Sequence, residues 1–352
     1  MVPSARVAVI VVNHQDYTRR YLAECYASLQ AQTYPADRFT VFIVNNGLPE
    51  AEVRLTGRLA SGARILSNDR NLGWGGGNNT AISVAMREGF DRFVLLNIDV
   101  IVDARWLAAL VEAAEARADV DILQSKILLY GTSRINSFGN RIHFLGYGYC
   151  YGYGAESAVP PPRVALDYAS GAAMLVKRRV FEAIGLFREE YFMYYDDVEF
   201  CWRARLAGFN VDMAEGSVCY HKYTFGNAIR WLYYVDRNRL MTVLTMERLG
   251  TLALILPCLV IAETVMTVYC VVRGWGSSRL KLFGYFLRPQ TWHSIHRRRR
   301  EIRALRRRRD AELVKRFSGQ IVFAEIDSPV LRYMVNPLLR IYWAIVRVLI
   351  IW

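Results

Sequence analysis

Four short runs rich in β-branched and other apolar residues, each followed by polar residues, restrict the fold of the N-terminal half. They are residues 7–12, 40–44, 64–66 and 92–96. Segments of helical character lie between them, at residues 17–32 and 80–88. This alternation predicts an α/β fold in which helices cover a mostly parallel sheet. In such sheets ligands bind beyond the carboxyl ends of the strands, and the polar clusters of this sequence stand at those ends.

A glycine-rich segment, NLGWGGGNN at residues 71–79, precedes the second of these helices. Its pattern differs from the G-x-G-x-x-G fingerprint of dinucleotide-binding folds. Three consecutive glycines could simply form a tight loop. Alternatively, bare backbone flanked by asparagines could approach a nucleotide or a diphosphate closely.

Asn97 and Asp99 follow the apolar run 92–96. Two residues apart in an extended chain, their side chains project from the same side. A carboxylate, an amide and two diphosphate oxygens would suit Mg²⁺ or Mn²⁺, although Asp99 could equally cap a turn. His221 follows a strand-like segment, residues 217–220, and could either complete this metal site or be structural.

The densest group of acids lies in the segment YFMYYDDVEFCWR, residues 191–203. Asp196, Asp197 and Glu199 repel one another unless a cation or a proton relieves them. In the first turn of a helix, Asp196 and Asp197 would interact favourably with the helix dipole, so helix capping is one explanation for these acids. A carboxylate here could also be the general base that takes a proton from an attacking hydroxyl.

Positive charge is concentrated near the C-terminus. Residues 273–316 contain fifteen basic and three acidic residues, which is +12 of the net +13 of the chain. The preceding segment, residues 251–272, is hydrophobic and long enough to span the ~30 Å of a bilayer core. Glu263 within it and the arginines beyond it favour an interfacial or re-entrant helix over a span. Residues 338–352 are also amphipathic. The arginines could alternatively bind nucleic acid, but we expect no nucleic-acid partner.

These features predict two domains, a catalytic domain at residues 1–246 and a helical, membrane-docking region at residues 247–352. Six cysteines without a C-x-x-C pair give no support to a zinc or thioredoxin-like site. The first twelve residues lack the pattern of a secretory signal. We therefore expect the protein at the cytoplasmic face of the cell membrane, as a peripheral or monotopic protein bound to an anionic surface.

The order of the motifs resembles the inverting family-2 glycosyltransferases with the GT-A fold, especially the bacterial rhamnosyltransferase and galactofuranosyltransferase-like branch. The resemblance covers about residues 6–244. The motifs that support it are VAVIVVNH, FIVNNG, NLGWGGGNN, LLNID in place of the family's D-x-D, SGAAMLVKR, and FMYYDDVEFCWRARLAG followed by His221. It implies a nucleotide-diphospho-sugar transferase fold with a Rossmann-like mixed sheet.

The resemblance also implies roles for particular residues. Asp197 matches the catalytic base, and Asp99 with His221 matches the metal ligands for Mg²⁺ or Mn²⁺. The positions implied for acceptor binding are Asp196, Glu199, Gly171 and Ala172. Those implied for donor binding are Val12, Asn13, Asn45, Asn46, Gly73, Trp74, Asn78 and Asn97. Two positions depart from the family pattern, because Asn45 and Asn97 stand where many relatives have aspartate.

The implied reaction moves a sugar from a nucleotide-diphosphate donor, with dTDP-rhamnose or a UDP-sugar favoured, to a hydroxyl of a polyprenyl-diphosphate-linked saccharide in cell-envelope polysaccharide synthesis. Two alternatives remain at this stage. The chain could be a non-catalytic scaffold that binds nucleotide sugars or lipids, or a transferase acting on a soluble acceptor.

Overall fold

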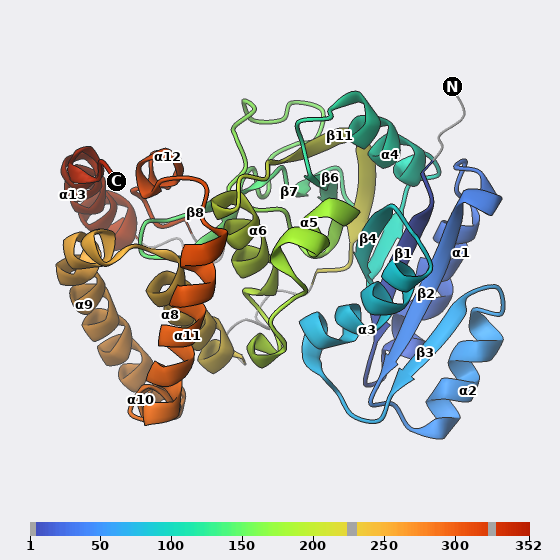
Figure 1. Ribbon diagram of the computed structural model, residues 1–352, viewed down its shortest axis with the longest axis horizontal. Helices are drawn as coiled ribbons and strands as arrows, with labels where there is room; N and C mark the ends of the chain where they lie inside the picture. The colour runs from blue at the N-terminus through green and yellow to red at the C-terminus, as the bar shows by residue number, and fades with distance from the viewer. Residues whose placement is uncertain (1–4, 224–230, 323–328) are drawn as a thin grey trace. The chain divides into compact units, whose positions relative to one another are not determined.

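The computed structural model describes residues 5–223, 231–322 and 329–352. The chain forms two compact units (Figure 1). The first consists of Met1–Asn140, Cys150–Ala204 and Phe209–Tyr223, and the second of Arg141–Tyr149, Arg205–Gly208 and Thr224–Trp352. The domain boundary after residue 246 stays a prediction.

A nine-stranded mixed sheet organises the first unit, in the order β3-β2-β1-β4-β10-β6-β11-β5, with β7 paired to β6. Strands β3, β2, β1 and β4 are parallel to one another, whereas β10 runs antiparallel to both β4 and β6. The strands are β1 (Val7–Asn13), β2 (Phe39–Asn46), β3 (Arg64–Asn68), β4 (Arg92–Asn97), β5 (Val100–Val102), β6 (Ile122–Leu129), β7 (Ile135–Ser137), β10 (Ala173–Lys177) and β11 (Val211–His221). Two further strands, β8 (Asn140–Ile142) and β9 (Gly148–Cys150), form a separate pair.

Helices pack on both faces of this sheet because alternate strand residues point to opposite sides. Val9 and Val11 share one buried cluster with Leu22 and Trp106, whereas Phe93 meets Phe181 on the other face. The helical segments are η1 (Thr18–Leu22), α1 (Ala23–Gln30), η2 (Ala36–Arg38), α2 (Glu50–Leu59), α3 (Gly73–Arg87), α4 (Trp106–Ala116), α5 (Arg178–Ile184), η3 (Glu189–Tyr191) and α6 (Asp196–Leu206). The predicted α/β fold, with a mixed sheet, is confirmed.

The glycine-rich segment is helical rather than a loop. Helix α3 begins at Gly73, so Gly75, Gly76 and Gly77 lie in its first turns. A Cβ on Gly75 would lie 2.7 Å from the Asp196 carboxylate, and one on Gly77 would lie 2.7 Å from Val12. Glycine is intrinsically a poor helix former. The low helix propensity of glycine is why the sequence pattern suggested a loop. In the structure, close packing against neighbouring segments requires glycine at these positions of the helix.

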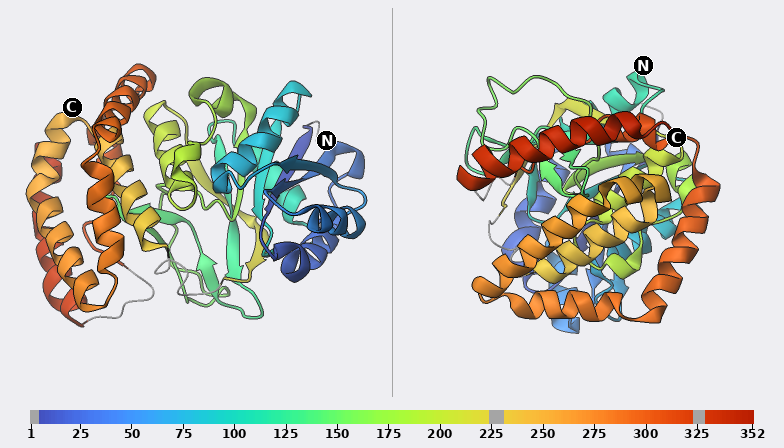
Figure 2. Two further views of the ribbon diagram at one scale, coloured as in Figure 1. Left: turned by 90° about the horizontal axis from the view of Figure 1, so that it is seen from below. Right: turned by 90° about the vertical axis from the view of Figure 1, so that its left-hand side faces the viewer.

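The second unit is helical among its described residues, apart from short segments of β8 and β9 (Figure 2). Its helical segments are α8 (Leu232–Met246), α9 (Leu249–Val272), α10 (Gly276–Phe286), α11 (Pro289–Leu305), α12 (Asp310–Val314), η4 (Leu331–Val335) and α13 (Asn336–Leu349). The predicted C-terminal helical region is therefore present. Within it Phe144 stacks on Trp343 with ring centroids 4.7 Å apart, which anchors α13.

Four charged residues join α8, α9 and α10, and three of them, Asp236, Arg239 and Arg279, are buried. Arg279 donates to Asp236 Oδ2 at 2.8 Å and to Glu263 Oε2 at 2.7 Å. Arg239, with no exposed surface, also pairs with Glu263. Although burial disfavours its charged form, Arg239 and Arg279 hold the pKa of Glu263 below its usual value. Glu263, the acid within the hydrophobic segment, thus faces cationic partners inside the unit.

Several arginines of the basic segment make internal contacts. Arg299 and Arg306 donate to the backbone carbonyls of Leu244 and Met246, and Arg308 donates to Gly208 O at 2.7 Å. Side chains such as Arg300 and Arg303 are exposed instead. Some arginines of this segment therefore stabilise the packing of the second unit, and others carry positive charge on its surface.

Candidate active site

The polar segments singled out in the sequence meet at one edge of the sheet. Strands β1, β2 and β4 are parallel, so Asn13, Asn45 and Asn97 all stand at their carboxyl ends. Because β10 runs antiparallel to β4, the residues before it reach the same edge, and Asn97 N donates to Ala172 O at 3.0 Å. Strand β11 also ends there, with His221. This convergence is the position expected for a ligand site in an open α/β sheet.

Asp99 and His221 form the first part of the site. Strand register brings them together, because His221 pairs with Val100, the residue after Asp99. The His221 Nε2 atom lies 3.4 Å from Asp99 Oδ1. Their side chains are 10% and 25% exposed, so both border the solvent. On its other side the ring contacts a buried amide, with Nδ1 3.1 Å from Asn136 Oδ1.

These two side chains fit one side of a metal site. With Asn136 presenting its amide oxygen, the contact is a hydrogen bond in the tautomer in which Nδ1 carries the hydrogen, and in that tautomer the Nε2 lone pair faces the Asp99 carboxylate. Two acceptors this close call for a cation or a proton between them. Within the described ranges no group of three or more His, Cys, Asp or Glu side chains is placed to hold a metal. Further ligands would therefore come from a bound molecule or water, as Mg²⁺ and Mn²⁺ allow.

Asp197 stands in the first turn of α6, where acids suit the helix dipole. Its Oδ2 accepts from Gly171 N and its Oδ1 from Val198 N, both at 2.9 Å. Burial raises the pKa of this carboxyl above its usual value, against the effect of these backbone donors. The group is thus oriented by backbone and is a stronger base than an ordinary aspartate.

Trp74 connects the two halves of the site. Its indole Nε1 donates to Asn97 Oδ1 at 2.9 Å. Its ring packs on Gly171, where an added Cβ would meet the ring at 2.7 Å. Gly171 in turn holds Asp197. A continuous set of contacts therefore runs from the end of β4 to the start of α6.

The backbone before Asp197 is strained. Phe192, Tyr194 and Tyr195 have φ values of 64°, 62° and 67°. Bulky residues rarely adopt this left-handed region, and each costs on the order of 1–3 kcal/mol. Phe192 O accepts from Trp74 N at 2.7 Å, which ties the strained segment to the start of α3. Strain of this kind concentrates at functional sites.

The remaining acids of the cluster are packed inside the unit. Asp196 is 4% exposed and faces Gly75. Glu199 is 2% exposed, and Arg203 donates to both of its oxygens, at 2.8 and 2.9 Å. Contact of these two acids with an acceptor stays a prediction, as does that of Gly171 and Ala172.

The predicted donor-binding asparagines make hydrogen bonds within the protein. Asn13 Nδ2 donates to Asn45 Oδ1 at 3.1 Å, whereas Asn45 Nδ2 is buried with no hydrogen-bond partner among the described residues. Asn46 binds Asn68, Asn71, Leu72 and Gly73 through its amide. Asn78 Nδ2 donates to Trp74 O. Donor binding by these residues, and by Val12 and Gly73, remains a prediction.

Three residues near the site were not predicted from the sequence. Asn136 lies on β7, a three-residue strand with no motif to mark it. His14 and Tyr17 pack edge to face, with ring centroids 4.5 Å apart, and Asp99 acts electrostatically on both. Burial lowers the pKa of His14, which keeps its ring neutral. The signal for His14 was its place directly after the first strand.

The chain is similar to two curated proteins. It is 42% identical over 50 residues, 14% of its length, to the "Low-salt glycan biosynthesis hexosyltransferase Agl10" of Haloferax volcanii. It is 28% identical over 196 residues, 52% of its length, to the "Uncharacterized protein y4gI" of Sinorhizobium fredii. The matches span 16% and 21% of the lengths of those proteins.

A solved structure shares the fold. GalNAc-T7, crystallised with UDP, GalNAc and Mn²⁺, is similar with a TM-score of 0.50 and 14% sequence identity, over 68% of this chain and 48% of that one. The sequence profile described as "Glycosyl transferase family 2" matches residues 8–184. That match contains β2, β4, β10 and the glycine-rich helix α3 together with Asp99, Gly171 and Ala172, whereas Asp197 and His221 lie beyond it. The predicted family is confirmed: the chain belongs to glycosyl transferase family 2.

Proposed function

We propose that this family-2 chain moves a sugar from a nucleotide-diphosphate donor to an acceptor hydroxyl, with inversion at the anomeric carbon. The observation that carries the proposal is the convergence of Asp99, His221 and Asp197 at the carboxyl edge of one sheet. The hexosyltransferase name of the Haloferax relative supports it at the level of reaction class.

In the proposed mechanism Asp197 is the base. It takes the proton of the acceptor hydroxyl while that oxygen attacks the sugar C1 from the side opposite the leaving diphosphate, and this displacement inverts the anomer. Gly171 N and Val198 N orient the carboxylate. Asp99 and His221 would hold Mg²⁺ or Mn²⁺, which when bound supplies positive charge for the leaving diphosphate. Asn97, held by Trp74, would stand beside the donor.

The test of this function is transfer itself. We expect release of nucleoside diphosphate from dTDP-rhamnose or a UDP-sugar, with product formed on a polyprenyl-diphosphate-linked saccharide in the presence of Mn²⁺ or Mg²⁺. The same saccharide without its lipid tests the soluble-acceptor alternative, and the product's anomeric configuration by NMR tests inversion. Donor binding without turnover on any acceptor would favour the non-catalytic scaffold instead.

We also propose that the second unit docks on an anionic membrane surface. Helix α9 is long and apolar enough to cross a membrane by length and composition, and it is the one such helix among the described residues. Glu263 stands near its middle and is paired with arginines of α8 and α10. A span of α9 would bring those charged partners to the bilayer centre, at about 2.5–3.5 kcal/mol or more for each. This cost favours an α9 that lies in the interface.

Exposed apolar side chains support this docking. All but four of the large apolar side chains that are exposed in the described ranges belong to residues 249–352. They occur along α9, as with Val260 and Val268, and recur on α13 as Ile341 and Ile345. Patches of this kind mark interaction sites, and exposed Arg340 and Arg347 on α13 favour anionic headgroups.

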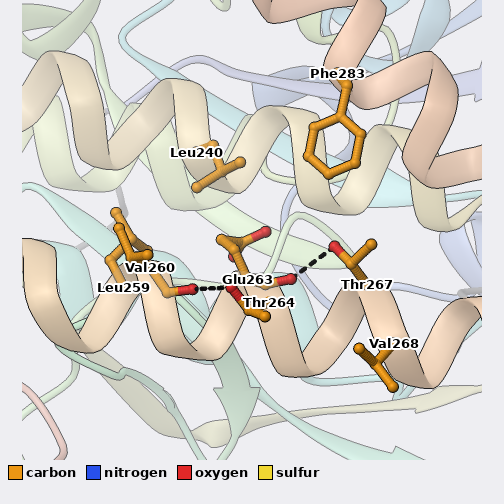
Figure 3. A pocket seen from close by; sticks show the side chains of 8 residues that line it. All are labelled: Leu240, Leu259, Val260, Glu263, Thr264, Thr267, Val268 and Phe283. Atoms are coloured by element: carbon orange, nitrogen blue, oxygen red, sulfur yellow. Dashed lines mark hydrogen bonds between the residues drawn. The ribbon is translucent and has the colours of Figure 1, made fainter.

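A shallow pocket of about 380 Å³ opens between α8, α9 and α10 (Figure 3). Its lining includes Leu240, Val260, Val268 and Phe283. The hydroxyls of its two threonines are bound to backbone carbonyls of α9, and the Glu263 carboxylate is paired with arginines. The pocket therefore offers mainly apolar surface, as a membrane-facing region requires.

Flotation of the full chain with vesicles tests the docking. We expect it to float with phosphatidylcholine vesicles containing phosphatidylglycerol, and to float less as the ionic strength rises. Ile341→Glu with Ile345→Glu should release most of it, because both side chains are 61% exposed. Val159→Glu, at a 78% exposed side chain of the first unit, is the matched control and should leave flotation unchanged. Equal flotation of all three proteins would contradict the proposal.

A further inference from the structure

Asn136 has a position in the site that neither the sequence motifs nor the family match assigns. It lies in β7, antiparallel to β6, while β6 lies parallel to β11, the strand that ends at His221. The side chain of Asn136 is buried, with the residue 5% exposed. Its Oδ1 lies 3.1 Å from His221 Nδ1. Sheet pairing, rather than a loop, therefore sets this contact.

The contact favours one position for the hydrogen on the His221 ring. An amide oxygen only accepts, so the contact is a hydrogen bond in the tautomer in which Nδ1 carries the hydrogen. In the neutral imidazole Nε2 then has no hydrogen and presents a lone pair. That atom lies 3.4 Å from Asp99 Oδ1. The ring is thereby set to bind a cation through Nε2 rather than to donate a hydrogen bond to Asp99.

We propose that Asn136 is a positioning residue that fixes the tautomer and the orientation of His221 for a divalent cation shared with Asp99. The inference rests on the proposed function, because it concerns the metal pair of the same site. Histidine ligands in metal sites commonly donate their second ring N–H to such a partner. Loss of that partner typically weakens metal binding 10–100-fold.

Three variants separate this role from a structural one. Asn136→Leu removes the acceptor at nearly constant size, and Asn136→Asp retains an acceptor oxygen. Asn140→Leu is the matched control, because Asn140 is also buried, at 1% exposed, and its amide contacts Gln124 and Ser137 rather than His221. Thermal unfolding of each variant establishes that it folds.

The first readout needs no metal. In the ¹⁵N spectrum of the histidine-labelled full chain, assigned with His221→Gln, we expect His221 in wild type to show a protonated Nδ1 and an unprotonated Nε2, and His221 in Asn136→Asp to keep a protonated Nδ1. In Asn136→Leu this single tautomer should be lost. An imidazolium in wild type, or an unchanged tautomer in Asn136→Leu, would overturn the proposal.

The second readout is the affinity for Mn²⁺ alone, from the EPR signal of the free ion. Asn136→Leu should bind about 10–100-fold more weakly than wild type, whereas Asn136→Asp and Asn140→Leu should bind as wild type does. If Asn140→Leu weakened Mn²⁺ binding as much as Asn136→Leu does, the role of Asn136 would be structural and the proposal would fail. If Asp99→Asn and His221→Gln leave Mn²⁺ binding unchanged, the metal pair of the proposed function fails, while the ¹⁵N spectra still decide the tautomer separately.

Discussion

Replacing Asp197 by asparagine is expected to abolish sugar transfer while donor binding persists. Asparagine keeps the size of the side chain and an oxygen for Gly171 N, but it cannot take a proton. General-base catalysis is typically worth about 10²–10⁴-fold, so kcat should fall by at least that factor with little change in donor affinity. Steady-state kinetics and nucleotide titration measure the two quantities. Turnover within tenfold of wild type would remove Asp197 from the role of base.

The pH dependence of the same residue provides a second measurement. Since burial raises the pKa of Asp197 above its usual value, turnover should decline as the pH falls through that raised pKa. The native state also holds this proton to a higher pH than the unfolded chain does. The resulting contribution to stability is present below the unfolded pKa and is lost as the pH rises through the folded one. Asp197→Asn should therefore be at least as stable as wild type at neutral pH, although it is inactive.

Replacing Arg279 by methionine is expected to cause the largest loss of stability, in the second unit. Arg279 is 1% exposed and contacts both Asp236 and Glu263. Its removal leaves the buried carboxylate of Asp236 and the partly buried carboxylate of Glu263 with Arg239 as their remaining cationic partner within this group. Breaking a buried ion pair in this way costs about 3–5 kcal/mol. Urea unfolding should show the loss in the transition of the helical unit.

Arg300→Met is the matched control for this prediction, because Arg300 is exposed on α11. Surface substitutions of this kind change stability by about 0.5 kcal/mol or less. Equal effects of the two substitutions would mean that this group of four charged residues does not hold α8, α9 and α10 together.

The strands and the site edge could be predicted from the sequence because their signals are local. Runs of β-branched residues ended by asparagine gave β1, β2 and β4 to within two residues at each end. The placement of Asp99 directly after β4 followed from the same pattern. Helix α9 likewise followed from a long apolar stretch, which Pro257 and Glu263 interrupt.

Features set by tertiary contacts could not be predicted in this way. The helical start of α3 contradicts the low helix propensity of Gly75, Gly76 and Gly77, and packing against other segments overrides it. The partners of Glu263 lie 24 and 16 residues away on other helices. Asn136 reaches His221 across 85 residues through strand pairing alone. No local pattern carries such information.

The central claim, a nucleotide-sugar site assisted by a divalent cation on Asp99 and His221, is tested most directly by thermal unfolding with UDP, dTDP, GDP and CDP, each with and without Mn²⁺. A ligand that binds only the native state raises the unfolding temperature. We predict that Mn²⁺ with one of these nucleotides stabilises the wild type and that Asp99→Ala loses this stabilisation. Stabilisation by no nucleotide under any condition, or equal stabilisation of Asp99→Ala, would contradict the claim.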